Sequence, residues 1–161
     1  ALLGTAACLS IIIGIPLGMF CARRQRLYSV IQPIMDFMQT MPAFVFMIPV
    51  IAFFGTGKPA AVVTTMIFGG TPVVRLTVLG LRGVPESVRE AAASFGASKW
   101  YLLTKVDLPL AAPSIRAGVN QTIMLSLAMV VVASLIGAKG LGEDVLEALQ
   151  YANVGQGILA G

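Results

Sequence analysis

Histidine is absent from this chain of 161 residues, and only two cysteines occur, Cys8 and Cys21. Two cysteines are too few for a disulfide scaffold or a zinc site. Both thiols lie in the first apolar stretch, so the sequence cannot bring together the nucleophile, base or metal ligands of an enzyme. We therefore expect no metal site and no catalytic residue, and we expect both cysteines to serve as small apolar side chains of a helix.

Charge is scarce as well, because Asp, Glu, Lys and Arg make up only 11% of the residues. Soluble domains carry about 25% charged residues. Hydrophobic residues make up 57% of the chain, and the mean hydropathy is +0.90. A soluble globule of this composition could not cover its surface with polar groups, whereas lipid accepts an apolar outer face. The composition predicts an integral membrane protein, and we expect no nucleic-acid partner.

Four apolar stretches predict an all-α, polytopic transmembrane bundle. The expected spans cover approximately residues 2–22, 36–55, 60–81 and 117–137. A fifth span can begin at Gly157, and Gly140–Tyr151 is expected to form a short amphipathic helix. No signal peptide is visible, and the chain reads as the core of a longer protein.

Helix breakers fall inside these stretches, namely Pro16, Pro42, Pro49, Pro72, Gly69 and Gly70. A packing kink explains any one of them. Their clustering in two neighbouring spans favours a pathway between helices, where freed carbonyl groups face protein or water.

Nine of the eleven basic residues follow the first span or lie around residues 75–116, and two spans separate these regions. Cytoplasmic loops collect Lys and Arg. The distribution therefore predicts that residue 1 is outside the cell and that a loop over residues 82–116 is cytoplasmic. Asp36 is expected at the cytoplasmic interface, near the cluster of Arg23, Arg24 and Arg26.

The cytoplasmic loop has a helical pattern of its own. Pro85 is suited to open a helix, and Gly96 can end it in the left-handed conformation. Between them an apolar stripe recurs at helical spacing, formed by Val88, Ala91, Ala92 and Phe95. Ser98 can cap a second short helix. The pattern predicts a helix–turn–helix knob that needs a partner to bury Phe95 and Trp100.

The return from this knob to the membrane contains Pro109 and Pro113, which are expected to interrupt it. The knob and the return together have a recognisable spacing, formed by Glu90, Ala91, Ala92, Gly96, Val106, Leu108 and Pro109. This spacing resembles the EAA-x3-G-x9-I-x-L-P signature of ABC importer permeases, with Val106 in place of isoleucine. The resemblance implies a permease of the type I importer fold, whose cytoplasmic helix pair docks into a groove on a separate ATPase subunit.

Further segments resemble the glycine betaine/proline, or quaternary amine, uptake branch of these permeases. They are Met38–Phe44, Gly118–Thr122 and the Gly137-x-x-Gly140-Leu141-Gly142 run. The resemblance implies a bacterial or archaeal plasma membrane protein that pairs with a second permease copy, two ATPase subunits and a substrate-binding protein or fused binding domain. The chain has no G-x-x-x-x-G-K-[ST] motif, so ATP and Mg²⁺ are expected on the partner and no cofactor on this chain.

The expected substrate pathway contains polar and aromatic side chains in or near the spans, namely Gln39, Asn120, Gln121, Phe44, Phe46 and Phe68. Aromatic faces attract quaternary ammonium groups, and polar groups inside a membrane are functional candidates. Lipid contact or helix packing equally explains each aromatic residue, and hydrogen bonding between helices equally explains Asn120 and Gln121.

The sequence is also compatible with other functions. The chain could carry another small solute, such as an amino acid. A transporter driven by an ion gradient would need carboxylates in the middle of its spans, and none of the seven acidic residues is expected there. A structural anchor would need neither the broken spans nor the cytoplasmic signature.

Overall fold

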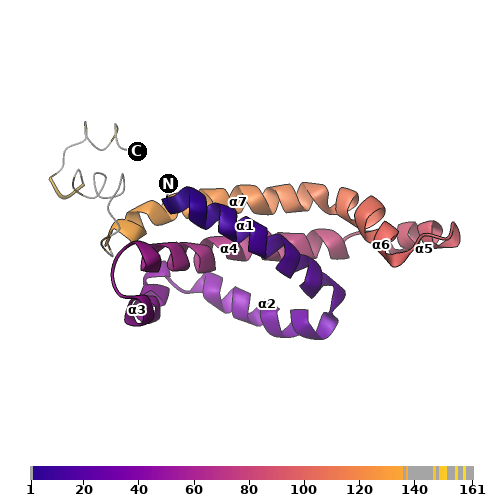
Figure 1. Cartoon of the computed structure of the whole chain (residues 1–161), viewed down its shortest axis with the longest axis horizontal. Helices are drawn as coiled ribbons and strands as arrows, with labels where there is room; N and C mark the ends of the chain where they lie inside the picture. The colour runs from indigo at the N-terminus through magenta and orange to yellow at the C-terminus, as the bar shows by residue number, and fades with distance from the viewer. Residues whose placement is uncertain are drawn as a thin grey trace.

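The computed structural model describes residues 2–135, 137, 147, 149–151, 155 and 158, and this part of the chain contains helices and turns but no strand. The principal helices are α1 (Leu2–Arg23), α2 (Gln25–Thr40), α3 (Ala43–Phe54), α4 (Lys58–Arg82) and α7 (Leu108–Leu135). α4 packs along both α1 and α7, and α2 and α3 lie beside this bundle (Figure 1). The all-α prediction is confirmed. The expected span from Gly157 and most of the expected helix at 140–151 lie outside the described residues.

Three helical segments of the described chain are long and apolar enough to cross a membrane, namely Gly4–Arg23, Lys58–Arg82 and Lys99–Leu135. The predicted span 36–55 is not one straight helix. Instead α2 and α3 meet at a bend of 105° and form at most one broken span. Met41 is extended because a residue before proline avoids the helical region, and Pro42 then opens α3.

The third long helix begins well before the predicted span 117–137. The short α6 (Lys99–Tyr101) continues through η1 (Leu102–Asp107), a π-helical segment, directly into α7. The expected interruption at Pro109 and Pro113 is therefore wrong. In the π-helical segment the amide of Leu108 donates to the carbonyl of Leu103, and this wider turn directly precedes the ring of Pro109. The segment from Lys99 is thus continuous with a membrane-spanning helix.

Glycines let the three long helices approach closely. A Cβ atom added at Gly18 of α1 would lie 2.7 Å from the Cβ of Thr77, and one added at Gly118 of α7 would lie 3.0 Å from the Cα of Val73. Gly69 and Gly70, which we interpreted as helix breakers, are buried inside the unbroken α4. A Cβ atom at Gly69 would lie 2.9 Å from the hydroxyl of Ser126. In α4 these glycines therefore allow the neighbouring helices to pack closely and do not break the helix.

Candidate functional site

The predicted knob projects beyond the end of α4 (Figure 1) and consists of α5 (Glu86–Ser94), α6 and η1. Pro85 precedes the first residue of α5, and its carbonyl accepts a hydrogen bond from the amide of Val88 at 3.1 Å. Proline suits this place because the first amides of a helix have no helical acceptor. The helix predicted from the apolar stripe is therefore confirmed.

Gly96 forms the turn between the two helices, as predicted. Its φ is +81°, in the left-handed region. The amide of Gly96 donates to the carbonyl of Ala93 at 2.9 Å, and the amide of Ala97 donates to the carbonyl of Ala92 at 3.2 Å. This pair of hydrogen bonds is the Schellman motif, which satisfies carbonyl groups at a helix end.

Ser98 caps the second helix, also as predicted. Its hydroxyl oxygen accepts a hydrogen bond from the amide of Tyr101 at 3.2 Å, and its carbonyl accepts one from the amide of Leu102 at 2.9 Å. Only one residue separates this cap from Gly96. The two local signals together fix the direction in which the chain leaves α5.

A clamp that the sequence analysis missed joins the knob to the bundle. The Nε of Arg89 donates to Asp107 at 2.7 Å, and its Nη2 donates to the carbonyl of Leu81 near the end of α4 at 2.6 Å. Asp107 is only 16% exposed, so this charge-assisted bond is sheltered from water. Asp107 occupies the variable position inside the Val106-x-Leu108-Pro109 motif. Its negative charge and the positive charge of Arg89 on the preceding helix were the features of the sequence that could have predicted this pair.

The outer face of the knob has no partner within the described chain. Phe95 is 92% exposed and Trp100 is 71% exposed. Between α5 and α6 lies an open hollow of about 520 Å³, and its lining includes Phe95, Gly96 and Tyr101. Large aromatic side chains at an open hollow are typical anchors of protein interfaces.

The structure divides the predicted coupling residues into two groups. Glu90, Ala91, Ala92 and Gly96 lie on α5 and its turn, and Ala92 is the half-buried member. The second group lies where η1 joins α7. There Val106 and Leu108 are half-buried, and Pro109 is exposed. The first group can contact a partner, and the second connects the knob to α7.

The predicted pathway residues do not form one cluster. The rings of Phe46 and Phe68 contact each other, with centroids 6.5 Å apart. Gln39 lies at the interface of α2 and α4. The side chains of Phe44, Asn120 and Gln121 are exposed, the last two on α7.

Asp36 does not lie beside the cluster of Arg23, Arg24 and Arg26, so that expectation is wrong. Its carboxylate pairs with Arg75 of α4 at 2.9 Å, and Arg75 also donates to Gln39 at 3.1 Å. α2 and α4 run side by side in opposite directions, and Asp36 in the last third of α2 lies beside Arg75 in the last third of α4. The opposite charges of Asp36 and Arg75, each in a different apolar stretch, were the feature of the sequence that could have predicted this pair.

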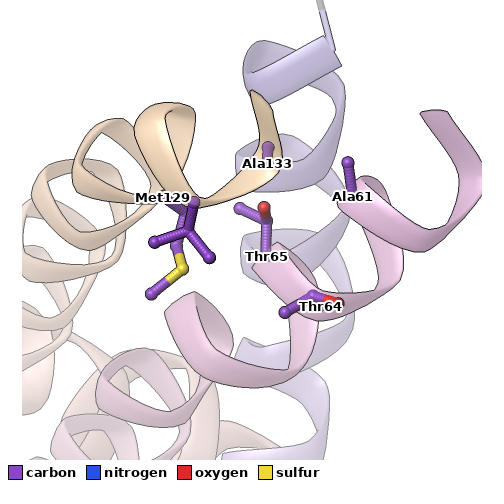
Figure 2. A pocket seen from close by; sticks show the side chains of 6 residues that line it. Ala61, Thr64, Thr65, Met129 and Ala133 are labelled. Carbon is purple, nitrogen blue, oxygen red and sulfur yellow. The ribbon is translucent and has the colours of Figure 1, made fainter. Parts of the chain in front are cut away.

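A small hollow lies between α4 and α7 at the end of the bundle away from the knob. Met129 and Ala133 of α7 face Ala61 and Thr65 of α4 there (Figure 2). The hollow has no room for a water molecule, so it cannot hold a solute. It is a packing gap between the two helices.

Comparisons with known proteins agree with the signature. Residues 14–161 match the family of binding-protein-dependent transport system inner membrane components. The chain is 48% identical over 157 residues to the glycine betaine/carnitine transport permease protein GbuB of Listeria monocytogenes. The aligned region covers 98% of this chain and 56% of that protein. It is also 48% identical over 161 residues to the glycine betaine/proline betaine transport system permease protein ProW of Escherichia coli. That alignment covers 100% of this chain and 46% of that protein. The chain thus spans about half the length of these relatives.

A solved structure shares the fold. The chain superposes on an inward-facing structure of the MetNI methionine ABC transporter with a TM-score of 0.84, over 99% of this chain and 81% of that chain. The sequence identity is 20%, so this likeness establishes the fold alone.

Proposed function

The chain belongs to the family of binding-protein-dependent transport system inner membrane components, and from this premise we propose that it forms the translocation core of an ATP-driven importer for a small osmoprotectant. The proposed substrate is glycine betaine, proline or a related quaternary amine. The names of the relatives, which include glycine betaine, carnitine and proline betaine, support a quaternary amine. The working assembly contains a second copy of the permease, two ATPase subunits, and a substrate-binding protein or fused binding domain. It sits in the plasma membrane with residue 1 outside and the knob in the cytoplasm.

The observation that carries this proposal is the pairing of an unburied aromatic face with a rigid connection to the bundle. Phe95 and Trp100 are available to a partner. Arg89 fastens α5 to the end of α4, and η1 continues into α7. A partner that displaces the knob therefore moves the ends of two membrane helices together.

The chemistry of this partner follows from the residues. Ala91 and Ala92 have small side chains, which permit close approach to another surface, and Glu90 is an exposed anion that can pair with a basic or amide group. ATP and Mg²⁺ belong to that partner, because this sequence has no P-loop. ATP binding and hydrolysis would then switch the bundle between two packings that open to opposite sides.

The gradient-driven alternative has less support. Asp36 does lie within an apolar bundle, but its carboxylate is already paired with Arg75 at 2.9 Å. A proton or sodium site needs a carboxylate that can change its partner or its charge without leaving a neighbouring cationic side chain unpaired. Another small solute of the amino acid type is the second candidate substrate, since the aromatic contact of Phe46 and Phe68 does not exclude one.

Affinity for the ATPase subunit tests the proposal. The full-length protein would be purified in nanodiscs as wild type, as Phe95→Ala and as Phe53→Ala, and its dissociation constant for the ATPase subunit measured. Phe53 is a matched control because it is 87% exposed on α3, away from the knob. We expect Phe95→Ala to weaken binding about tenfold, as for an anchoring aromatic residue, and Phe53→Ala to change nothing. Equal affinities for all three proteins would refute docking through the knob.

A further inference from the structure

An ion pair lies within the part of the bundle that is apolar enough to span a membrane. Arg82 at the end of α4 packs over the ring of Tyr28 near the start of α2, 4.2 Å from the ring centroid. Arg75 lies seven residues before Arg82, and Asp36 lies eight residues after Tyr28. At 1.5 Å per residue these steps equal about 10 Å and about 12 Å along the two antiparallel helices. The pair of Asp36 and Arg75 is thus about 10 Å inside the basic end of the bundle.

Charged groups at this depth are not left facing lipid. They pair with each other, face protein or line a water-filled cavity. The side chains of Arg75 and Asp36 are 39% and 43% exposed in the single chain, so their pairing does not bury them. Their open side must therefore face another protein surface or an aqueous pathway.

The guanidinium of Arg75 uses only part of its donor set. Its Nη1 donates to Asp36 at 2.9 Å and to Gln39 at 3.1 Å. Among the residues that the structure describes, none accepts a hydrogen bond from its Nε or Nη2. Arg89 differs, because its Nε and Nη2 both have acceptors. The unused edge of Arg75 has two parallel N–H donors, the geometry that binds a carboxylate through two hydrogen bonds.

An aromatic contact lies on the same face of α4. Phe68 is seven residues, or two helical turns, before Arg75, and its ring contacts Phe46. Aromatic faces attract a quaternary ammonium group, whereas a guanidinium attracts a carboxylate. The α2–α3–α4 face therefore presents a partner for an ammonium group and, about 10 Å away, a partner for a carboxylate. A small zwitterion would meet these two partners one after the other.

From this arrangement we propose that Arg75 binds the carboxylate of the zwitterionic substrate on its way through the bundle. The inference rests on the proposed function, since it requires this face to line the pathway. Gln39 orients the guanidinium, and Asp36 attracts the ammonium end of the substrate. Asp36 also neutralises Arg75, so that the carboxylate is held weakly and can leave. Arg75 does not bind solutes that lack a carboxylate and does not promote their passage.

The simpler interpretation is that the ion pair only joins α2 to α4. A charge exchange separates the two interpretations. The double variant Asp36→Arg/Arg75→Asp can keep the pair but moves the guanidinium from α4 to α2. A purely structural link survives this exchange, whereas a carboxylate site on α4 does not.

The experiment reconstitutes the full-length protein with its ATPase subunit and binding protein in liposomes. It measures uptake of labelled glycine betaine per ATP hydrolysed, together with recovery of the assembled complex. Wild type is compared with the exchange variant, with Arg75→Gln and with Arg75→Lys, which keeps the charge but not the paired donors. Arg26→Gln is the matched control, because Arg26 is an exposed arginine at the start of α2.

We expect all variants to assemble and hydrolyse ATP, with uptake per ATP at least about tenfold lower in Arg75→Gln and in the exchange variant. Arg75→Lys should be intermediate, and Arg26→Gln should match wild type. Wild-type uptake by Arg75→Gln, or its restoration in the exchange variant, would overturn the carboxylate site. No uptake of glycine betaine by the wild type would instead overturn the proposed function, and this inference with it.

Discussion

Replacing Gly96 by valine should weaken the proposed docking of this chain to an ATPase subunit through the backbone alone. Gly96 has a φ of +81°, and, apart from Gly96 and its two chain neighbours, no residue has an atom within 4 Å of the place where a Cβ would stand. A Cβ at this position therefore meets no steric obstacle from residues farther along the described chain. The left-handed conformation itself costs an L-residue about 1–2 kcal/mol. A β-branched side chain is among the least tolerant of it.

This strain sets the size of the effect. A free-energy difference of about 1–2 kcal/mol lowers the population of the native turn by up to roughly 5- to 30-fold. If the ATPase binds only the native turn, its dissociation constant rises by up to the same factor. The variant should therefore uncouple ATP hydrolysis from transport or, at the upper end, fail to assemble.

The assay measures the dissociation constant of the full-length protein for the ATPase subunit, in nanodiscs, for wild type, Gly96→Val and Gly96→Asn. Asparagine is a matched control because it is bulky but adopts the left-handed conformation more readily than other residues. We expect Gly96→Asn to bind within a few-fold of wild type. Equal weakening by both variants would show that side-chain volume matters and would refute the backbone argument, as would wild-type binding by Gly96→Val.

Three further predictions follow from contacts elsewhere in the chain. Arg89→Gln should increase local opening of α5 about tenfold, measured by hydrogen exchange, because a charge-assisted bond to Asp107 is lost. Gly18→Ala should lower the melting temperature in detergent, because its Cβ would lie 2.7 Å from the Cβ of Thr77 and overpacking costs about 1–3 kcal/mol. Phe44→Ala should change the uptake of quaternary amines more than it changes assembly, since Phe44 is an exposed aromatic residue of the expected pathway.

Each of these has its own control. Asp107→Asn should reproduce the faster hydrogen exchange of Arg89→Gln. Unchanged hydrogen exchange in both variants would show that the pair of Arg89 and Asp107 does not stabilise α5. Gly4→Ala should leave the melting temperature unchanged or raise it, because no other helix has an atom within 4 Å of the added Cβ. Unchanged uptake by Phe44→Ala would remove Phe44 from the pathway.

The features that the sequence predicted correctly are those that depend on neighbouring residues. Gly96 and Ser98 have direct local effects on a helix end and a helix start, and both act in the structure as predicted. The bend at Pro42 also has a local cause, but its size of 105° depends on how α3 packs against α4. The sequence therefore predicted the breaker without predicting that one span becomes two helices.

The features that it missed depend on contacts between distant segments. Asp36 and Arg75 are 39 positions apart, and only the antiparallel packing of α2 and α4 brings them together. The clamp of Arg89 and Asp107 likewise requires the turn at Gly96. Pro109 fails to break its helix because a π-helical segment precedes it, and helix propensity alone does not predict such a segment.

Measurement of ATP-dependent uptake distinguishes an ATP-driven importer from a gradient-driven transporter. Liposomes containing the full-length protein and its ATPase subunit would be supplied with the binding protein and labelled glycine betaine, with ATP inside or absent, and with ion gradients imposed or abolished. We expect uptake that requires ATP and the binding protein and continues after ionophores abolish the gradients. Uptake that follows a sodium or proton gradient without ATP or the ATPase subunit would contradict the proposed ATP-driven importer.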